Sequence, residues 1–124
     1  MDNCIFCKIA NGEIPSNKLY EDDKVVVIMD LNPAVDGHSL VIPKKHVTDF
    51  TELDDELLAH INKVAKEIGP KLCDVLGTKA LKLVVNYLDE QLVKHYHLHI
   101  LPNKLSQKAT RSSKETYDMI KDSF

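Results

Sequence analysis

The sequence predicts an α+β fold: an antiparallel sheet of about five strands, with one long helix and a short N-terminal helix. Two observations support this fold class. Apolar, β-branched runs lie near both ends of the chain, and one long amphipathic segment separates them, which favours α+β over a parallel βαβ arrangement. With 124 residues, of which 44% are hydrophobic and 28% charged, the chain has the size and composition of one globular domain.

The first predicted elements are short. Residues 6–10 are expected to form one helical turn, and a short strand could begin at residues 19–21. The β-branched run at residues 25–29 predicts a buried strand. Residues 39–42 predict another strand, which ends at Pro43 because proline has no N–H to donate to a neighbouring strand.

One long helix is predicted over residues 54–76. Acidic residues at 54–56 suit the positive end of the helix dipole, and Gly77 is a natural stop. The Gly69-Pro70 pair could kink or break the helix, because proline removes a backbone hydrogen bond. Apolar residues recur every three or four positions and form the expected buried stripe: Leu57, Ile61, Val64, Ile68, Leu72 and Val75.

Two further strands are predicted at residues 81–87 and 96–101, and Pro102 closes the second of them. After these strands, Ser112 and Glu115 have the spacing of a capping box. This pair predicts a short helix that starts at Ser112.

Charge and composition exclude several classes of function. A net charge of −3 gives no indication of stable nucleic-acid binding, and the slightly basic residues 103–124 are interpreted as a solvated face. The uncharged run at 25–29 is too short to span a bilayer, and no basic segment precedes an apolar one as in a secretory signal. We therefore expect a cytoplasmic protein without a membrane partner. Disulfides are not expected in the cytoplasm. Cys73 is interpreted as a small buried apolar residue.

Three histidines, His95, His97 and His99, alternate with apolar residues in one predicted strand. On a strand the histidines would project to one face, and the apolar residues between them would pack against the long helix on the other. His38 and His46 flank another predicted strand. Most of the histidines are thus expected to lie near one another.

Three interpretations of these histidines compete. A merely structural face is disfavoured, because histidine is not a typical strand residue and clustered imidazoles are destabilising when charged. One metal ion bound by all three is strained, because His95 and His99 would be roughly 13 Å apart along a strand. Phosphate chemistry fits better: a neutral imidazole is a competent nucleophile, and flanking donors can stabilise the phosphoryl oxygens.

These residues resemble the signature of the histidine-triad (HIT) proteins, His-φ-His-φ-His-φ-φ with φ apolar, at residues 95–101. The similarity extends over nearly the whole chain. It includes Cys4 to Ile9, Glu13-Ile14-Pro15, Tyr20-Glu21-Asp22, Asp30, Gly37 to His46, and Asn86.

The resemblance implies an enzyme that hydrolyses purine nucleotide conjugates, such as phosphoramidates, at the α-phosphate. His97 would attack the phosphorus and form a covalent nucleotidyl-histidine, which water then hydrolyses. The residues implied to bind the substrate are His38, His99 and Asn86 at the α-phosphate, Asp30 and Leu31 at the ribose, and Phe6 and Ile9 at the base.

The Cys4-x-x-Cys7 motif has two interpretations. A redox pair is disfavoured, because no βαβ pattern surrounds the two cysteines. The resemblance implies instead a structural Zn²⁺ site formed by Cys4, Cys7, His46 and His95, and no organic cofactor. It also implies a homodimer that pairs through the long helix and a neighbouring strand to give one continuous ten-stranded sheet.

Leu92 departs from the family pattern, because many members have a serine or threonine there that assists the leaving group. This keeps two alternatives open: a dinucleoside polyphosphate hydrolase, and a zinc-stapled nucleotide-binding module without catalysis. A uridylyltransferase-like activity is disfavoured, because that branch has glutamine in place of His99. The expected organisation is a HIT domain at residues 1–102 and a C-terminal tail at 103–124 packed on or near the active site.

Overall fold

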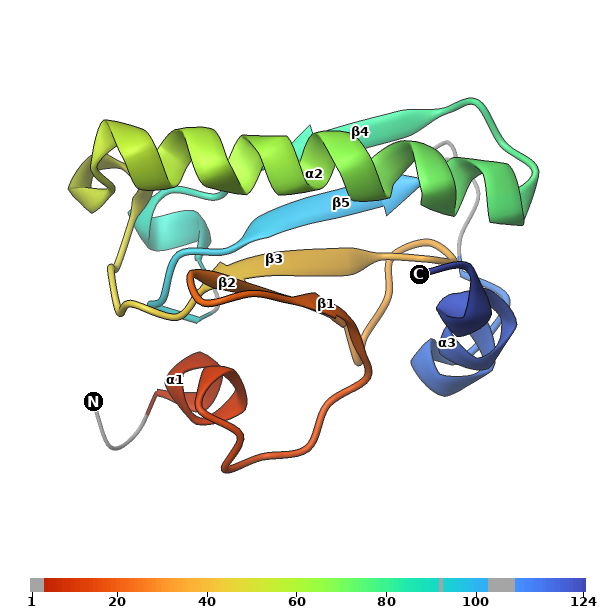
Figure 1. Cartoon of the computed structure of the whole chain (residues 1–124), viewed down its shortest axis with the longest axis horizontal. Coiled ribbons are helices and arrows are strands. Elements are labelled where there is room, and N and C mark those ends of the chain that lie inside the picture. The colour runs from red at the N-terminus through yellow and green to blue at the C-terminus, as the bar shows by residue number, and fades with distance from the viewer. Residues whose placement is uncertain (1–3, 92, 103–108) are drawn as a thin grey trace.

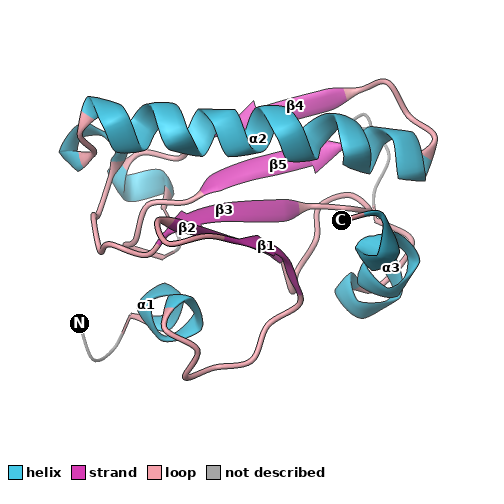
Figure 2. Ribbon diagram, in the orientation of Figure 1, coloured by secondary structure: helices cyan, strands magenta, loops and turns pink. Residues whose placement is uncertain are grey.

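The computed structural model describes residues 4–91, 93–102 and 109–124, and it has the predicted α+β fold (Figures 1 and 2). Within these residues, no helix is long and apolar enough to cross a membrane. The helices and strands, in chain order, are α1 (Ile5–Ala10), β1 (Lys18–Glu21), β2 (Val25–Met29), β3 (Ser39–Pro43), α2 (Asp55–Leu76), β4 (Leu81–Val84), β5 (Leu98–Pro102) and α3 (Ser113–Ile120).

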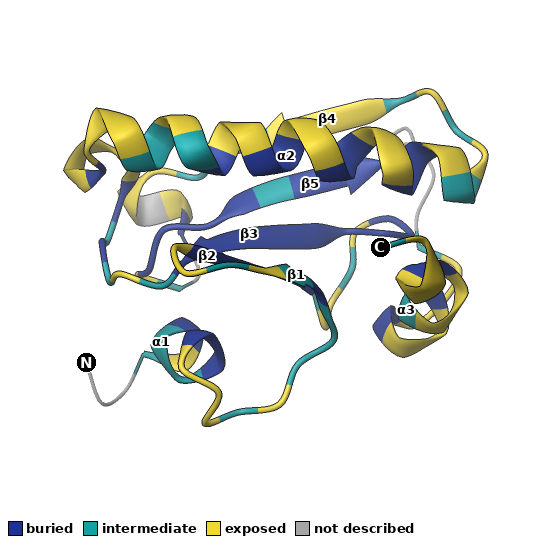
Figure 3. Ribbon diagram, in the orientation of Figure 1, coloured by how far each residue is buried: buried dark blue, intermediate teal, exposed yellow. Residues whose placement is uncertain are grey.

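The five strands form one antiparallel sheet in the order β1-β2-β3-β5-β4. β3 and β5 are neighbours although more than fifty residues separate them in the sequence, and their register places Leu40 opposite His99. The predicted β-branched strand, β2, lies inside the sheet and is buried at every position, as is its neighbour β3. β4 is an edge strand with mostly exposed residues (Figure 3).

Each face of the sheet is covered by different helices. α2 runs along one face, and the apolar side chains of α2, α3 and that face form the larger core. On the opposite face, α1 packs Phe6 and Ile9 against alternate residues of the central strands, including Ile28 and Leu40. The histidine cluster described below lies on the face that α1 covers.

α2 has the predicted boundaries and the predicted buried stripe. The side chain of Asp54 accepts a hydrogen bond from the backbone N–H of Leu57, and Gly77 ends the helix in a left-handed conformation. The helix continues through Pro70, so the Gly69-Pro70 pair does not break it. Pro70 and Lys66 both lie on the exposed side of α2, where water can solvate the carbonyl group that proline leaves unpaired.

Two strand boundaries differ from the prediction. β4 ends at Val84, three residues earlier than predicted, and a 3₁₀ turn follows at Leu88–Glu90. β5 begins at Leu98 rather than Tyr96, because the N–H of Tyr96 donates to the carbonyl of Val47, which lies beyond the end of β3. The alternation is nevertheless retained, since the apolar residues of this segment enter the core beside α2.

His60, the histidine outside the main group, belongs to a small network around Asp22. One carboxylate oxygen of Asp22 accepts hydrogen bonds from the Tyr20 hydroxyl and from Nε2 of His60, each at 2.7 Å. The other accepts the backbone N–H groups of Lys24 and Val25. Burial opposes ionisation, but these hydrogen bonds outweigh it and hold the pKa of Asp22 well below its usual range.

We expect Asp22→Asn to destabilise the protein by about 2 kcal/mol at pH 7, because an amide binds these donors less strongly than a carboxylate. A carboxylate with a lowered pKa stabilises the fold above its unfolded pKa of 3.8 and loses this effect as the pH falls. Urea unfolding should therefore show a difference that shrinks below pH 4. Asp23→Asn, at the exposed neighbouring position, is the control. Equal stability of Asp22→Asn and the parent at pH 7 would contradict this prediction.

Candidate active site and metal centre

The sheet brings three histidines together near the junction of β3 and β5. His38 directly precedes β3, His97 directly precedes β5, and His99 lies within β5. The ring centroids of His97 and His99 are 4.8 Å apart, and those of His38 and His99 are 5.1 Å apart. Phe6 of α1 packs edge-on against His97 at a centroid distance of 4.9 Å. The cluster therefore combines imidazoles with an aromatic wall.

His97 has the arrangement of a nitrogen nucleophile. Its Nδ1–H donates to the backbone carbonyl of His95 at 2.7 Å, so the lone pair of the neutral ring lies on Nε2. Burial lowers the pKa of His97, and the hydrogen bond to His95 and the charge of Asp30 oppose this only in part. The ring is therefore neutral at pH 7 with one nitrogen available for attack.

His38 and His99 are oriented as hydrogen-bond donors. The backbone N–H of Ala34 donates to Nδ1 of His38 at 3.0 Å, so the proton of this neutral ring lies on Nε2. Nε2 of His38 lies 2.9 Å from Nδ1 of His99 and 3.4 Å from a carboxylate oxygen of Asp30. Because Nδ1 of His99 accepts the Nε2–H of His38, His99 keeps its own proton on Nε2. Nδ2 of Asn86 lies 3.4 Å from this nitrogen, so two donors face each other there and both can donate to a ligand.

Both of these rings are neutral at physiological pH. The pKa of His99 is lowered to about 4. Burial is the main cause, and the neighbouring rings of His97 and His38 lower this pKa further. Burial also lowers the pKa of His38, although the carboxylate of Asp30 opposes it. The cluster thus presents uncharged N–H donors beside one free nitrogen, the combination that attack on a phosphate ester or amide requires.

A second group combines the Cys-x-x-Cys motif with two histidines. The four candidate ligand atoms of Cys4, Cys7, His46 and His95 lie within 4.8 Å of one another. Sulfur–nitrogen distances are 3.1–3.3 Å, near the roughly 3.6 Å that a tetrahedral Zn²⁺ site gives from its usual bond lengths. The buried ring of His95 donates its Nε2–H to the carbonyl of Pro43 at 2.8 Å, which leaves the lone pair of Nδ1 facing the two sulfurs.

The electrostatics of this group favour a bound cation. Burial and the adjacent Cys4 raise the pKa of the Cys7 thiol to about 11, so two thiolates at this spacing are unfavourable without a positive charge between them. Asp30, His38 and His99 also lie within 4.8 Å of one another, but they are a poorer donor set. The proton on Nε2 of His38 occupies the position at which a metal would need a lone pair.

The other predicted substrate-binding residues have different environments. Ile9 is buried beside Phe6 in the apolar cluster beneath α1. Leu31 is 75% exposed, and its side chain is free to contact a ligand. One oxygen of Asp30 accepts the backbone N–H of Asn32, as in a turn, while the other faces His38. Leu92, where the family pattern has a hydroxyl, lies outside the described residues.

Two residues without a predicted role, Asp36 and Gly37, shape the loop before His38. Asp36 is a buried carboxylate, and Gly37 has a φ of +84°. A Cβ at Gly37 would lie 2.5 Å from Cδ1 of Leu76 and 2.8 Å from Cγ of Pro102, so this loop packs closely on the ends of α2 and β5. The turn dipeptide Asp-Gly immediately before a histidine was the available signal.

We expect Gly37→Ala to destabilise the protein by roughly 2–5 kcal/mol, the sum of left-handed backbone strain and overpacking. Gly12→Ala is a matched control, because Gly12 has a similar φ of +86° but no atom within 4 Å of its Cβ position. The control should lose only about 1–2 kcal/mol. Urea unfolding of both variants measures the difference, and equal losses would contradict close packing at Gly37.

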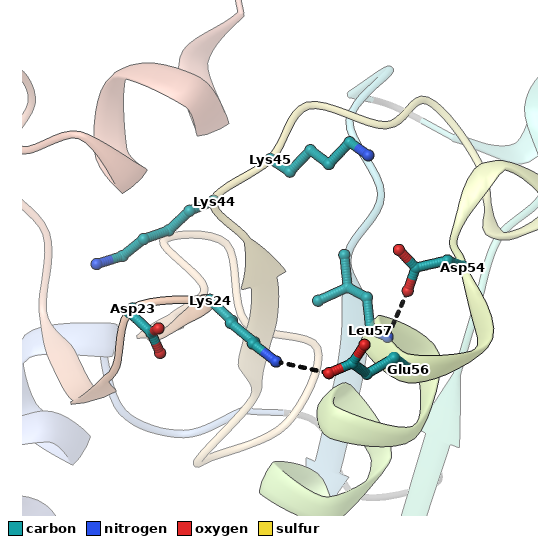
Figure 4. Close-up of a pocket in the computed structure, with 7 residues that line it drawn as sticks. All are labelled: Asp23, Lys24, Lys44, Lys45, Asp54, Glu56 and Leu57. Atoms are coloured by element: carbon teal, nitrogen blue, oxygen red, sulfur yellow. Dashed lines mark hydrogen bonds and ion pairs between the residues drawn. The ribbon is translucent and has the colours of Figure 1, made fainter.

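A surface pocket of about 270 Å³ lies apart from the histidines, between the start of α2 and the loops that carry Lys24, Lys44 and Lys45 (Figure 4). Two of its three lysines are in ion pairs: Lys24 contacts Glu56 at 3.4 Å, and Lys44 contacts Glu21 at 2.8 Å. Because none of the clustered histidines lines it, the pocket is separate from the candidate active site.

Fold and site together define a class of protein: a small α+β domain that holds neutral imidazoles beside a Cys₂His₂ group. The chain belongs to the HIT family, since the model of the HIT domain matches residues 11–105. It is 45% identical over 102 residues to a HIT-like protein of Methanocaldococcus jannaschii, and the match covers 80% of this chain and 78% of that protein.

Two further relatives are named for a ligand or an activity. The adenosine 5′-monophosphoramidase of Schizosaccharomyces pombe is 40% identical over 104 residues, covering 81% of this chain and 74% of that one. The crystal structure of a Zn-bound histidine triad family protein from Mycobacterium smegmatis superposes with a TM-score of 0.87 at 30% identity, covering 98% of this chain and 92% of that one.

Proposed function

We propose that the protein hydrolyses purine nucleotide conjugates at the α-phosphate, with His97 as the nucleophile and an amine as the preferred leaving group. The observation that carries this proposal is the hydrogen bond from Nδ1 of His97 to the carbonyl of His95, which leaves Nε2 unprotonated. The name of the phosphoramidase from S. pombe supports the choice of an amine leaving group.

The proposed reaction has two displacements at phosphorus. Nε2 of His97 attacks the α-phosphorus, the phosphorus–nitrogen bond of the substrate breaks, and the amine leaves after taking up a proton. Water then attacks the phosphorus of the nucleotidyl-histidine, the bond from phosphorus to Nε2 of His97 breaks, and the water gives up a proton to solvent in place of the one that the amine took up. The products are the nucleoside monophosphate and the free His97 ring. His38, His99 and Asn86 supply hydrogen bonds to the phosphoryl oxygens, where charge is concentrated in the transition state.

The remaining residues would bind the nucleoside. Asp30 has one carboxylate oxygen directed toward the cluster and could accept hydrogen bonds from the ribose hydroxyls, with the exposed Leu31 beside it. Phe6 already contacts the ring of His97, and Ile9 packs beside Phe6. The side chains of Phe6 and Ile9 would form an apolar wall of the pocket that binds the nucleotide base.

The test compares hydrolysis of adenosine phosphoramidate and diadenosine polyphosphate by the same preparation. We expect a higher kcat/KM for the phosphoramidate and, after rapid acid quenching, an intact-mass signal for adenylylated protein. A preference for the dinucleotide would favour the polyphosphate hydrolase. Tight binding of AMP without turnover of either substrate would identify a binding module and overturn the proposal.

We also propose that Cys4, Cys7, His46 and His95 hold a structural Zn²⁺. The ligand distances and the hydrogen bond from His95 to Pro43 support this site, and the Zn-bound relative from M. smegmatis agrees with it. The ion would neutralise the two thiolates and tie α1 to the loops before β5 and after β3. Elemental analysis of protein purified without chelator should give about one equivalent of zinc, and less than half an equivalent would contradict the site.

A homodimer through β4 is the proposed assembly. Within the described residues, β4 is an edge strand whose outer backbone groups pair with no other strand, and exposed apolar side chains lie next to this edge. Leu81, Leu83 and Val85 are 36%, 49% and 40% exposed. Pairing of two β4 strands would join two five-stranded sheets into one, and the two copies of α2, which packs against Leu81 at Gly69, would cover these side chains.

We expect light scattering to give the mass of a dimer, and Leu83→Lys to shift it to that of a monomer, because a buried lysine at a paired edge is strongly unfavourable. Lys82→Glu changes charge on the same strand at a position that already carries an exposed polar side chain, so it serves as the control. A parent protein with the mass of a monomer at micromolar concentration would contradict this assembly.

A further inference from the structure

We propose that Asp36 is a positioning residue: it clamps residues 109–111 onto the loop before β3 and thereby fixes the protonation of the His38 ring. This inference rests on the proposed function, because it concerns the donor that His38 offers to the phosphate. Asp36 itself would touch neither substrate nor product.

The side chain of Asp36 binds the beginning of the C-terminal segment through four hydrogen bonds. One oxygen accepts the backbone N–H groups of Thr110 and Arg111, at 2.9 and 3.0 Å. The other accepts the Thr110 hydroxyl at 2.9 Å and the guanidinium of Arg111 at 3.0 Å. Asp36 is only 8% exposed, and all four partners come from residues more than seventy positions away. Such a carboxylate is a specific anchor rather than a solvated surface charge.

A second contact connects the same segment to His38. The backbone N–H of Ala109 donates to the carbonyl of Ala34 at 3.2 Å, and the N–H of Ala34 donates to Nδ1 of His38 at 3.0 Å. Residues 109–111 therefore hold the loop at two points, Ala34 and Asp36. The intervening turn is closed by the N–H of His38, which donates to the carbonyl of Val35 at 3.2 Å.

The consequence for His38 follows from its two nitrogens. A neutral imidazole carries one ring proton, and the N–H of Ala34 forces this proton onto Nε2, which faces His99. If the loop moved and Ala34 withdrew, the proton could reside on Nδ1. Nε2 could then no longer donate to Nδ1 of His99, and it would present a lone pair where a phosphate oxygen needs a donor, so a favourable hydrogen bond would become a repulsion.

Asp36 remains ionised at neutral pH, as the clamp requires. Burial opposes its charge, but the hydrogen bonds from Thr110 and Arg111 outweigh burial and lower the pKa of Asp36 below its usual value. The clamp is therefore present over the whole pH range in which the other groups of the site are neutral.

The experiment uses Asp36→Ala, Asp36→Asn and the control Ile120→Val. Asp36→Ala removes all four acceptors, whereas Asp36→Asn keeps one oxygen for the two backbone N–H groups. Ile120 is fully buried in α3, so its truncation weakens the C-terminal segment without touching the clamp. Nitrogen-15 shifts of the imidazoles report the position of the His38 proton in the protein without substrate, and kcat is measured with adenosine phosphoramidate.

For Asp36→Ala we expect partial or complete loss of the Nε2–H form of His38 and a fall in kcat of at least about 10-fold. Asp36→Asn should lie between Asp36→Ala and the parent, and Ile120→Val should leave both readouts unchanged. An unaltered His38 proton in Asp36→Ala, or the same loss in Ile120→Val, would overturn the clamp. Because the nitrogen shifts need no turnover, this result is independent of whether the proposed hydrolysis occurs.

Discussion

His97→Ala is expected to lower kcat/KM for adenosine phosphoramidate by at least about 10³-fold, because no other group of the described site has an unprotonated nitrogen facing the substrate. The affinity for AMP should change much less, since the donors of His38 and His99 remain in place. Steady-state kinetics and calorimetric titration with AMP measure the two effects separately.

The matched control is His60→Ala. His60 binds Asp22 on a different part of the molecule, so its loss should reduce stability but leave turnover near that of the parent. The labelled covalent intermediate should be absent from His97→Ala and present in His60→Ala. Turnover of His97→Ala at the rate of the parent would exclude His97 as the nucleophile.

Cys7→Ser is expected to abolish stoichiometric zinc binding and to cost at least about 3 kcal/mol of stability, or roughly 10 °C in Tm. Serine is a poor zinc ligand, and the loss would leave the buried His95 ring without its partner. His95 also holds His97, because its carbonyl accepts the Nδ1–H of the nucleophile. We therefore expect the loss of the metal to lower the activity of the remaining folded protein.

Cys73→Ser is the control for a cysteine substitution as such. Cys73 is buried in α2 and its sulfur faces the carbonyl of Ala80, far in sequence from the Cys-x-x-Cys motif. Its zinc content should equal that of the parent. Thermal unfolding with and without a chelator, followed by addition of zinc, measures the contribution of the metal directly. A Tm insensitive to chelator in metal-loaded parent protein would refute a structural role.

Periodicity accounts for the elements that were predicted well. The stripe of α2 and the β-branched run of β2 are long, strongly patterned segments, and their positions agree with the structure. The two shifted strand boundaries depend on contacts that no local pattern encodes. Tyr96 pairs with the distant Val47, and Leu88 adopts a φ of +46° at the start of the 3₁₀ turn that comes directly after the predicted strand.

The sequence alone determined which chemical groups are available. Alternation of histidine with apolar residues at 95–101 predicted imidazoles on one side of a strand and core residues on the other. The two cysteines of the N-terminal motif supplied a pair of thiols. These are local properties, because the twofold repeat of an extended chain fixes the side to which each residue projects.

Only the tertiary structure decided how these groups are protonated and held. The register of β3 and β5 brings His38 to His99 across sixty-one residues, and the N–H of Ala34 then selects which nitrogen of His38 carries its proton. The Asp36 clamp likewise joins residues separated by more than seventy positions. Hydrogen-bond direction depends on which atoms meet in space, and in this fold those atoms meet through long-range strand pairing and loop packing.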